Sequence, residues 1–282
     1  MRVFKQKEAL ISQLSAEKNN HKTIGLVPTM GALHKGHLSL VSRALEENDL
    51  VVVSIFVNPT QFNNPEDLAK YPKTLDKDVG LLEELNDQII IFAPSAEEMY
   101  QDDITSEKFD FDGLEFQMEG KFRPGHFDGV GTIVKKLFNT VTPDRAYFGE
   151  KDYQQLQIIK KLTEKEQLDV QIIECPITRE SSGLAMSSRN ERLPKDLRNK
   201  AAFIYKTISK AKEKFSTQSI QQTLDWINDQ FVNHEDFELE YVEIADQKTL
   251  KSVKVKKNGE HYRLFVAVYA NDIRLIDTIA LN

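Results

Sequence analysis

The stretch TIGLVPTMGALHKGHLSLV, Thr23 to Val41, joins an apolar run to a helical pattern through a junction rich in glycine and histidine. The run TIGLV (23–27) is apolar without alternation, which is typical of a strand buried on both faces. Beyond the junction, LSLVSRALEEN (38–48) has the spacing of an amphipathic helix. We therefore expect a strand, a tight loop and a helix, the unit from which parallel α/β sheets are built.

The same alternation continues to about residue 175. The apolar, β-rich runs expected as strands are 23–27, 50–56, 88–93, 145–149 and 169–175. The helical patterns between them are 38–48, 75–86, 130–141 and 152–167. This order predicts an α/β fold with a Rossmann-like, doubly wound parallel sheet covered on both faces. One segment, ITSEKFDFDG (104–113), interrupts the pattern, and we expect a strand or hairpin there.

After Pro176 the pattern changes to helices followed by strands. Two long helices are expected at 194–215 and 219–233, and strands at 237–246, 261–270 and 273–281. Such an order is typical of a small α+β domain. We expect two domains, 1–178 and 179–282.

Composition excludes several classes of protein. The chain has 282 residues and a formal net charge of −7, which argues against a broad nucleic-acid surface. A single cysteine, Cys175, cannot form an internal disulfide, which fits a reducing compartment. Neither a signal peptide nor an apolar stretch of about 18 residues is recognisable, so we expect a cytoplasmic protein that does not contact membranes.

His34 and His37 mark the junction after the first strand. If the helix begins near Gly36 or His37, its first backbone N–H groups and its dipole favour an anion, and both imidazoles project to the same side. Gly31 and Gly36 allow a ligand to approach the backbone closely. The alternative is an ordinary loop histidine followed by an exposed one. A metal site is less favoured, because no third ligand lies at a suitable spacing, and the Walker pattern is absent.

The segment YFGEKDYQQLQ offers a second set of groups at a strand end. Lys151 is a point charge suited to phosphate, and Gln155 lies one turn after Asp152 on the same helix face. Asp152 is equally suited to the ordinary role of helix N-cap.

Three further segments carry polar groups that suit an anionic or hydroxylated ligand. GLAMSSRN offers the hydroxyls of Ser187 and Ser188 and the guanidinium of Arg189, or is a helix-capping loop. NPTQF places the amides of Asn58 and Gln61 just past a buried strand, or is an ordinary Asn-Pro turn.

The third of these, EGKFRPGHFDGVGT, reads as a mobile loop able to bring Arg123 or His126 over a pocket, or as a connector. The nucleophile elbow G-x-S-x-G is absent, so the anion-binding groups point to nucleotide-dependent group transfer, in which positioning and charge neutralisation dominate.

Taken together, these segments resemble the pantothenate synthetase (pantoate–β-alanine ligase) family. The matching stretches are VPTMGALHKGH, VSIFVNPTQF, EGKFRPGHFDGV, FGEKDYQQL, GLAMSSRN and RLID, in the family's order over about residues 3–280. The resemblance implies a ligase that forms an amide bond and works in pantothenate, and hence coenzyme A precursor, biosynthesis. ATP and pantoate would form pantoyl adenylate and pyrophosphate with Mg²⁺, and β-alanine would then displace AMP.

The resemblance also implies roles for individual residues. Catalytic groups would be His34, His37, Lys151 and Arg189, with His37 stabilising the leaving group. ATP would further contact Met30, Gly31, Gly149, Asp152, Met186, Ser187 and Ser188. Pantoate would contact Gln61 and Gln155, with Asn58 and Arg123 nearby, and Asp152 is a candidate Mg²⁺ ligand. The first domain would bind nucleotide and pantoate, the second would act as a lid, and a homodimer is expected.

One position departs from the family pattern R-x-x-D-G-L-A: Ser182 stands where Asp is usual. Serine can still form the turn, so we expect a small change in the loop and retained activity. The rival interpretations are another H-x-G-H adenylyltransferase and a non-catalytic nucleotide-binding relative. A tRNA-charging fragment is disfavoured by the acidic net charge.

Overall fold

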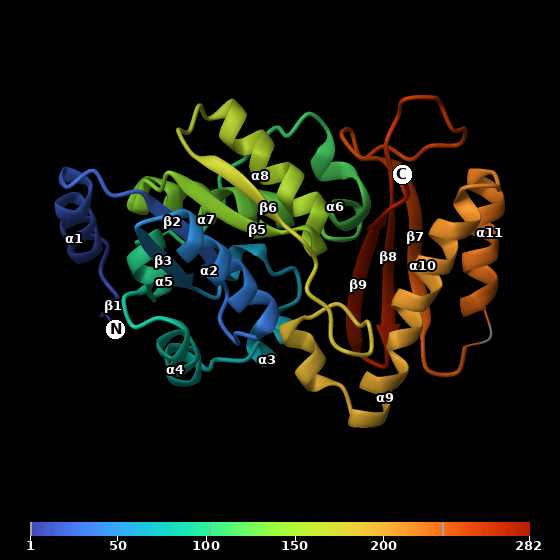
Figure 1. Cartoon of the computed structure of the whole chain (residues 1–282), viewed down its shortest axis with the longest axis horizontal. Coiled ribbons are helices and arrows are strands. Elements are labelled where there is room, and N and C mark those ends of the chain that lie inside the picture. Colours follow the sequence, from blue (N-terminus) through green and yellow to red (C-terminus); the bar gives the residue numbers. More distant parts are fainter. Residues whose placement is uncertain (1, 102, 233) are drawn as a thin grey trace. The chain divides into compact units, whose positions relative to one another are not determined.

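The computed structural model describes residues 2–101, 103–232 and 234–282, and it divides into two compact units (Figure 1). Unit 1 comprises residues 1–150 and 155–176, and unit 2 comprises 151–154 and 177–282. The domain bounds expected from the sequence stay a prediction.

Unit 1 is built on a six-stranded parallel sheet in the order β1-β4-β3-β2-β5-β6. Its strands are β1 (Arg2–Phe4), β2 (Ile24–Thr29), β3 (Leu50–Ile55), β4 (Ile90–Phe92), β5 (Arg145–Gly149) and β6 (Gln171–Cys175). Its α-helices are α1 (Lys7–Asn19), α2 (Lys35–Glu47), α3 (Pro65–Lys70), α4 (Leu75–Leu85), α5 (Ala96–Tyr100), α6 (Met118–Phe122), α7 (His126–Val141) and α8 (Tyr153–Lys165). Short 3₁₀ turns are η1 (Pro59–Gln61), η2 (Leu114–Phe116) and η3 (Glu150–Asp152). Residues 151–154, in η3 and the first turn of α8, are assigned to unit 2.

The strand order makes this sheet doubly wound, which confirms the predicted fold class. From β2 the chain moves through α2 to β3 on one side, whereas β5 pairs with the other side of β2. Because crossovers are right-handed, helices that move the chain in opposite directions cover opposite faces of the sheet. Accordingly α2 packs with α4 over β2 and β3, and α7 packs with α1 on the other face. The connections that follow β2 and β5 therefore diverge, and ligands of such sheets bind where this happens.

Cys175 ends β6 opposite Gly149 of β5. The thiol is 3% exposed, and the Nη1 atom of Arg43 lies 3.8 Å from its Sγ. Burial raises the pKa of the Cys175 thiol, although Arg43 opposes the shift. It is a small, buried core residue.

The segment 104–113 is not a strand or hairpin, so that expectation was wrong. Within the described residues it forms neither a helix nor a strand, and several of its backbone N–H groups donate to side chains. Glu107 N donates to Thr132 Oγ1 at 2.9 Å and Phe109 N to Asp128 Oδ1 at 3.1 Å. Because α7 supplies these acceptors from its side chains, the segment lies along a helix and needs no strand partner.

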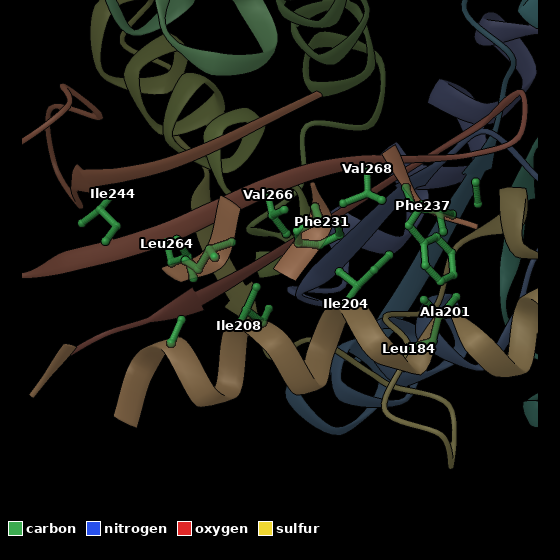
Figure 2. Close-up of a cluster of buried hydrophobic side chains, with 14 of the residues drawn as sticks. Leu184, Ala201, Ile204, Ile208, Phe231, Phe237, Ile244, Leu264, Val266 and Val268 are labelled. Atoms are coloured by element: carbon green, nitrogen blue, oxygen red, sulfur yellow. The ribbon is translucent and has the colours of Figure 1, made fainter. Parts of the chain in front are cut away.

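Unit 2 is a three-stranded antiparallel sheet, β7-β8-β9, with helices packed on it. Its elements are η4 (Ser188–Arg192), α9 (Lys195–Lys200), α10 (Ala202–Phe215), α11 (Ile220–Phe231), β7 (Glu238–Asp246), β8 (Tyr262–Ala270) and β9 (Ile273–Ala280). The helix predicted over 194–215 is two helices that meet at Ala201, and Asn233, the predicted end of the next, lies outside the described residues. Figure 2 shows how Ile204 and Ile208 of α10 pack against Leu264, Val266 and Val268 of β8.

Candidate active site

His34 and His37 form a capping box at the N-terminus of α2. The helix begins at Lys35, earlier than expected, with His34 as its N-cap. His34 Nδ1 accepts from Gly36 N at 3.1 Å, and His37 Nδ1 accepts from His34 N at 3.4 Å. The two rings lie 4.0 Å apart between centroids. A nitrogen that accepts a hydrogen bond carries no proton, so in the neutral rings the proton is on Nε2, which is then a donor suited to a phosphate oxygen.

The loop before His34 is held by a buried carboxylate that the sequence analysis missed. Asp78 of α4 is 1% exposed, and its Oδ2 and Oδ1 accept from Ala32 N at 2.9 Å and Leu33 N at 2.7 Å. Thr74 Oγ1 donates to the same carboxylate at 3.1 Å. Gly31 has φ +80°, and a Cβ there would lie 3.1 Å from Asp78 Oδ2. The tight loop thus depends on glycine at one position and on Asp78 across from it.

Gln61 lies in the turn after β3, beside the loop after β2. Its side chain is buried, and its Nε2 lies 3.0 Å from Met30 Sδ. Asn58 Nδ2 donates to Gln61 Oε1 at 3.2 Å and to Gly129 O at 3.1 Å. An amide has two donors and two acceptor lone pairs, so among the described residues Gln61 keeps one of each for a ligand.

Asn58 is 1% exposed and fully engaged. Besides its two donated bonds, Asn58 Oδ1 accepts from Tyr100 Oη at 2.6 Å and from Thr60 Oγ1 at 3.2 Å. Burial raises the pKa of the Tyr100 hydroxyl, which keeps it protonated as the donor. The predicted substrate contact of Asn58 stays a prediction, and its surroundings fit the role of holding Gln61.

Arg123 and His126 lie against the main chain of Gln61. Arg123 Nη2 donates to Gln61 O at 3.3 Å, and the buried His126 Nδ1 lies 2.8 Å from the same oxygen. The expected mobile loop is instead the end of α6 and the start of α7. In α7, Gly129 is required by packing, because a Cβ there would lie 2.5 Å from Thr60 O.

The residues after β5 divide between the two units. In unit 1, Gly149 ends the strand, and a Cβ there would meet no atom within 4 Å, so a ligand can approach this backbone. Gln155, also in unit 1, is partly exposed, and its side chain makes no hydrogen bond to any residue in the described ranges. In unit 2, Lys151 Nζ lies 3.4 Å from Asp152 Oδ1 within η3.

Ser187, Ser188 and Arg189 follow a small hairpin in unit 2. Met186 N donates to Thr178 O at 3.0 Å and Glu180 N to Leu184 O at 2.8 Å. Ser187 then caps η4, its Oγ accepting from Arg189 N at 3.3 Å. The hairpin turn contains Ser182, whose Oγ accepts from Leu184 N at 3.4 Å, and Gly183, with φ +98°.

Of the predicted site residues, nine belong to unit 1: Met30, Gly31, His34, His37, Asn58, Gln61, Arg123, Gly149 and Gln155. Lys151, Asp152, Met186, Ser187, Ser188 and Arg189 belong to unit 2. In the described part of the chain, no group of three His, Cys, Asp or Glu side chains is arranged to hold a metal ion. Nor is any helix in those residues long and apolar enough to cross a bilayer.

Comparisons with known proteins identify the family. A family model described as pantoate-beta-alanine ligase matches residues 2–280. A protein of Christiangramia forsetii named pantothenate synthetase is 58% identical over all of both chains, and one of Flavobacterium psychrophilum with the same name is 55% identical over the same span.

Solved structures agree as well. The pantothenate synthetase of Thermus thermophilus has a TM-score of 0.91 at 38% identity, covering 100% of this chain and 99% of that one. The pantoate-beta-alanine ligase of Francisella tularensis, solved with a form of ATP and β-alanine, has a TM-score of 0.78 at 36% identity, covering 100% and 98%. Since the family model spans nearly the whole sequence and these relatives match end to end, the chain belongs to the pantoate–β-alanine ligase family.

Proposed function

We infer that this chain is an AMP-forming ligase that condenses pantoate with β-alanine to give pantothenate, with ATP as the activating substrate. The observation that carries this function is the pairing of two chemistries in unit 1. Two imidazoles whose Nδ1 atoms accept backbone N–H groups at a helix N-terminus suit the phosphates of a nucleotide, and two amides, Gln61 and Gln155, suit a hydroxy acid.

The reaction proceeds in two displacements. A carboxylate oxygen of pantoate attacks the α-phosphorus of ATP, a P–O bond forms, and the bond to pyrophosphate breaks. The amine of β-alanine then attacks the acyl carbon, the C–O bond to AMP breaks, and the nitrogen loses a proton. The first step converts a poor leaving group into a good one.

In the proposal, His37 and His34 donate from Nε2 to the phosphates, where negative charge grows on the departing pyrophosphate. Loss of one such donor costs on the order of 10²-fold in rate, and His37 is expected to be the most sensitive position. Lys151, Ser187, Ser188 and Arg189 of unit 2 would add cations and hydroxyls to the same phosphates. Gln61 and Gln155 would hold pantoate, and Asn58 and Arg123 would keep Gln61 in place.

Mg²⁺ is proposed as the companion of the nucleotide. Magnesium retains waters and is commonly held by phosphate oxygens with one or two carboxylates, so a dedicated cage is not required. The half-exposed carboxylate of Asp152, 48% exposed beside Lys151, fits such a role. When bound, the ion would neutralise phosphate charge.

We also propose that unit 2 acts as a lid, and that the protein is a cytoplasmic homodimer. Closure would exclude water from the reactive adenylate. Size-exclusion chromatography with light scattering tests the dimer, and small-angle scattering with and without ATP tests the closure.

The experiment that tests the function is ATP–pyrophosphate exchange with Mg²⁺, with and without pantoate, before β-alanine is added. We expect exchange only with pantoate, followed by release of AMP and pantothenate on addition of β-alanine. Exchange that requires a different acceptor would assign the chain to another adenylyl transfer. Absence of exchange from a folded sample that binds ATP would support the non-catalytic alternative.

A matched pair of variants tests the pantoate site. Gln155 and Gln157 lie two residues apart on α8 and are both partly exposed. Loss of a hydrogen bond of about 1.4 kcal/mol raises the pantoate KM about tenfold in Gln155→Ala. Gln157→Ala lies on a different face of the helix and is expected to keep the parent KM.

A further inference from the structure

Two stretches of sequence meet in unit 2 although neither is explained by the chemistry above. One is the hairpin Ile177–Met186, which leads directly into Ser187–Arg189, and the other is the RLID stretch of β9. Arg179, in the first arm of the hairpin, forms an isolated β-bridge with Ala185 in the second. A contact that holds this hairpin in place therefore also sets the position of Ser187, the next residue along the chain.

Arg179 joins the hairpin to the sheet. Its Nη1 and Nη2 donate to Asp277 Oδ2 at 2.6 Å and Oδ1 at 2.9 Å. Its Nη1 also donates to Gly183 O at 3.2 Å, in the hairpin turn. The guanidinium lies 3.8 Å from the ring centroid of Tyr205 on α10. One side chain thus contacts the turn, a strand and a helix.

Asp277 is a rigid anchor for this contact. It is 4% exposed, and its Oδ1 also accepts from Thr278 N at 2.8 Å. It pairs in register with Val266 of β8, a strand whose residues are nearly all buried. The bidentate geometry fixes both the distance and the plane of the guanidinium.

The cost of burying this pair argues for a role in positioning. Buried ion pairs are often no more stabilising than apolar side chains of similar volume, because both charges lose water. What such a pair supplies is a defined orientation, and catalytic and binding groups gain most from being held before the ligand arrives.

We propose that Arg179 and Asp277 are positioning residues for the nucleotide: they hold the hairpin so that Ser187, Ser188 and Arg189 meet the phosphates in one arrangement. The proposal rests on the proposed function only in that the ligand is ATP. It needs neither residue to touch the nucleotide.

The test compares two doubly apolar variants. Single changes, Arg179→Met or Asp277→Leu, leave a buried charge without its partner and are expected to lower Tm. The double variant Arg179→Met, Asp277→Leu is expected to have a Tm closer to that of the parent, but it lacks the hydrogen bond from Arg179 to Gly183 O. The matched control is the double variant Arg274→Met, Glu240→Leu, which removes an Arg–carboxylate pair between β9 and β7. The side chain of Arg274 is 19% exposed, close to the 17% of Arg179, whereas that of Glu240 is 17% exposed and that of Asp277 only 2%.

The readouts are Tm, the ATP Kd from calorimetry and the β-alanine KM. For the Arg179→Met, Asp277→Leu variant we expect a Kd for ATP weakened about tenfold, the effect of one charged hydrogen bond, with an unchanged β-alanine KM. The control is expected to keep both values within about twofold.

An ATP Kd equal to that of the parent in the double variant would overturn the proposal. If that variant does not fold, the nearly isosteric variant Asp277→Asn is measured instead. An ATP Kd equal to that of the parent would again refute the proposal. A parent chain that binds ATP but shows no pantoate-dependent exchange refutes the proposed function alone, because the Kd comparison still stands. A parent chain that binds no ATP overturns both.

Discussion

Replacing Asp78 by Asn removes the charge that holds the loop between β2 and His34. The carboxylate accepts from two consecutive backbone N–H groups, at 2.9 and 2.7 Å, and is 1% exposed. An Asn side chain of the same shape keeps one acceptor and turns an NH₂ group toward the other N–H. One charged hydrogen bond, worth about 1.5–3 kcal/mol, is lost, and one buried donor is left unpaired at about 1–3 kcal/mol.

Because these two costs overlap, we expect the free energy of unfolding to fall by about 2–4 kcal/mol in Asp78→Asn. Chemical denaturation measures this change, and hydrogen exchange at the amides of Ala32 and Leu33 locates it. The control is Asp76→Asn: Asp76 lies in the first turn of the same helix and is exposed. Its loss costs less than about 1 kcal/mol through the helix dipole.

The ATP Kd is expected to weaken with Asp78→Asn and not with Asp76→Asn, since His34 follows the loop directly. Equal stabilities of the two variants, with equal protection of Ala32 and Leu33, would refute the reasoning.

Three further predictions concern other parts of the chain. Gly129→Ala is expected to destabilise unit 1 by about 1–3 kcal/mol and to raise the pantoate KM, because its Cβ would lie 2.5 Å from Thr60 O. The control, Gly80→Ala, lies at an open helix position and should instead stabilise the protein by up to about 1 kcal/mol. Thermal unfolding measures both changes. Burial raises the pKa of Tyr147 to about 12, so its contribution to the free energy of unfolding is complete below the unfolded pKa of 10.0 and is lost as the pH rises to about 12. Chemical denaturation across this pH range should show a shallower decline in stability for Tyr147→Phe than for the parent. Parallel declines in the two proteins would contradict this prediction. Ser182→Asp should change the ATP KM by less than about threefold, because serine already accepts from the turn and Gly183 sets its conformation; a larger change in steady-state kinetics would show that the charge matters.

The sheet of unit 1 was predictable because its strands are buried on both faces and so read as unbroken apolar runs. β5 begins and ends at the predicted residues, 145 and 149. β1 was missed, because its three residues, Arg2–Phe4, are too few to form such a run. The error at 104–113 has a similar origin: alternating apolar residues suit a strand, but here side chains of α7 take the place of a partner strand.

The site residues stay predictions, and the strongest candidates in the sequence were those that follow strands directly. The spacing of His34 and His37 indicated an anion site, yet the capping box was not foreseen, since that motif usually pairs Ser or Thr with Glu or Gln. Asp78 and Asp277 were missed as supporting residues because their partners, Leu33 and Arg179, lie 45 and 98 positions away. Nothing local in a sequence reports a contact over such a distance.

The single thiol of the chain is a built-in probe of local opening in the sheet of unit 1. Cys175 is 3% exposed at the end of β6, so an aromatic disulfide reagent reaches it only when that edge of the sheet opens. The colour released over time then counts openings of the strand beside Gly149 without an added label. The rate of this reaction, measured with and without ATP and pantoate, would give the frequency with which the edge of the sheet beside the candidate site opens. It would also show whether the substrates slow that opening.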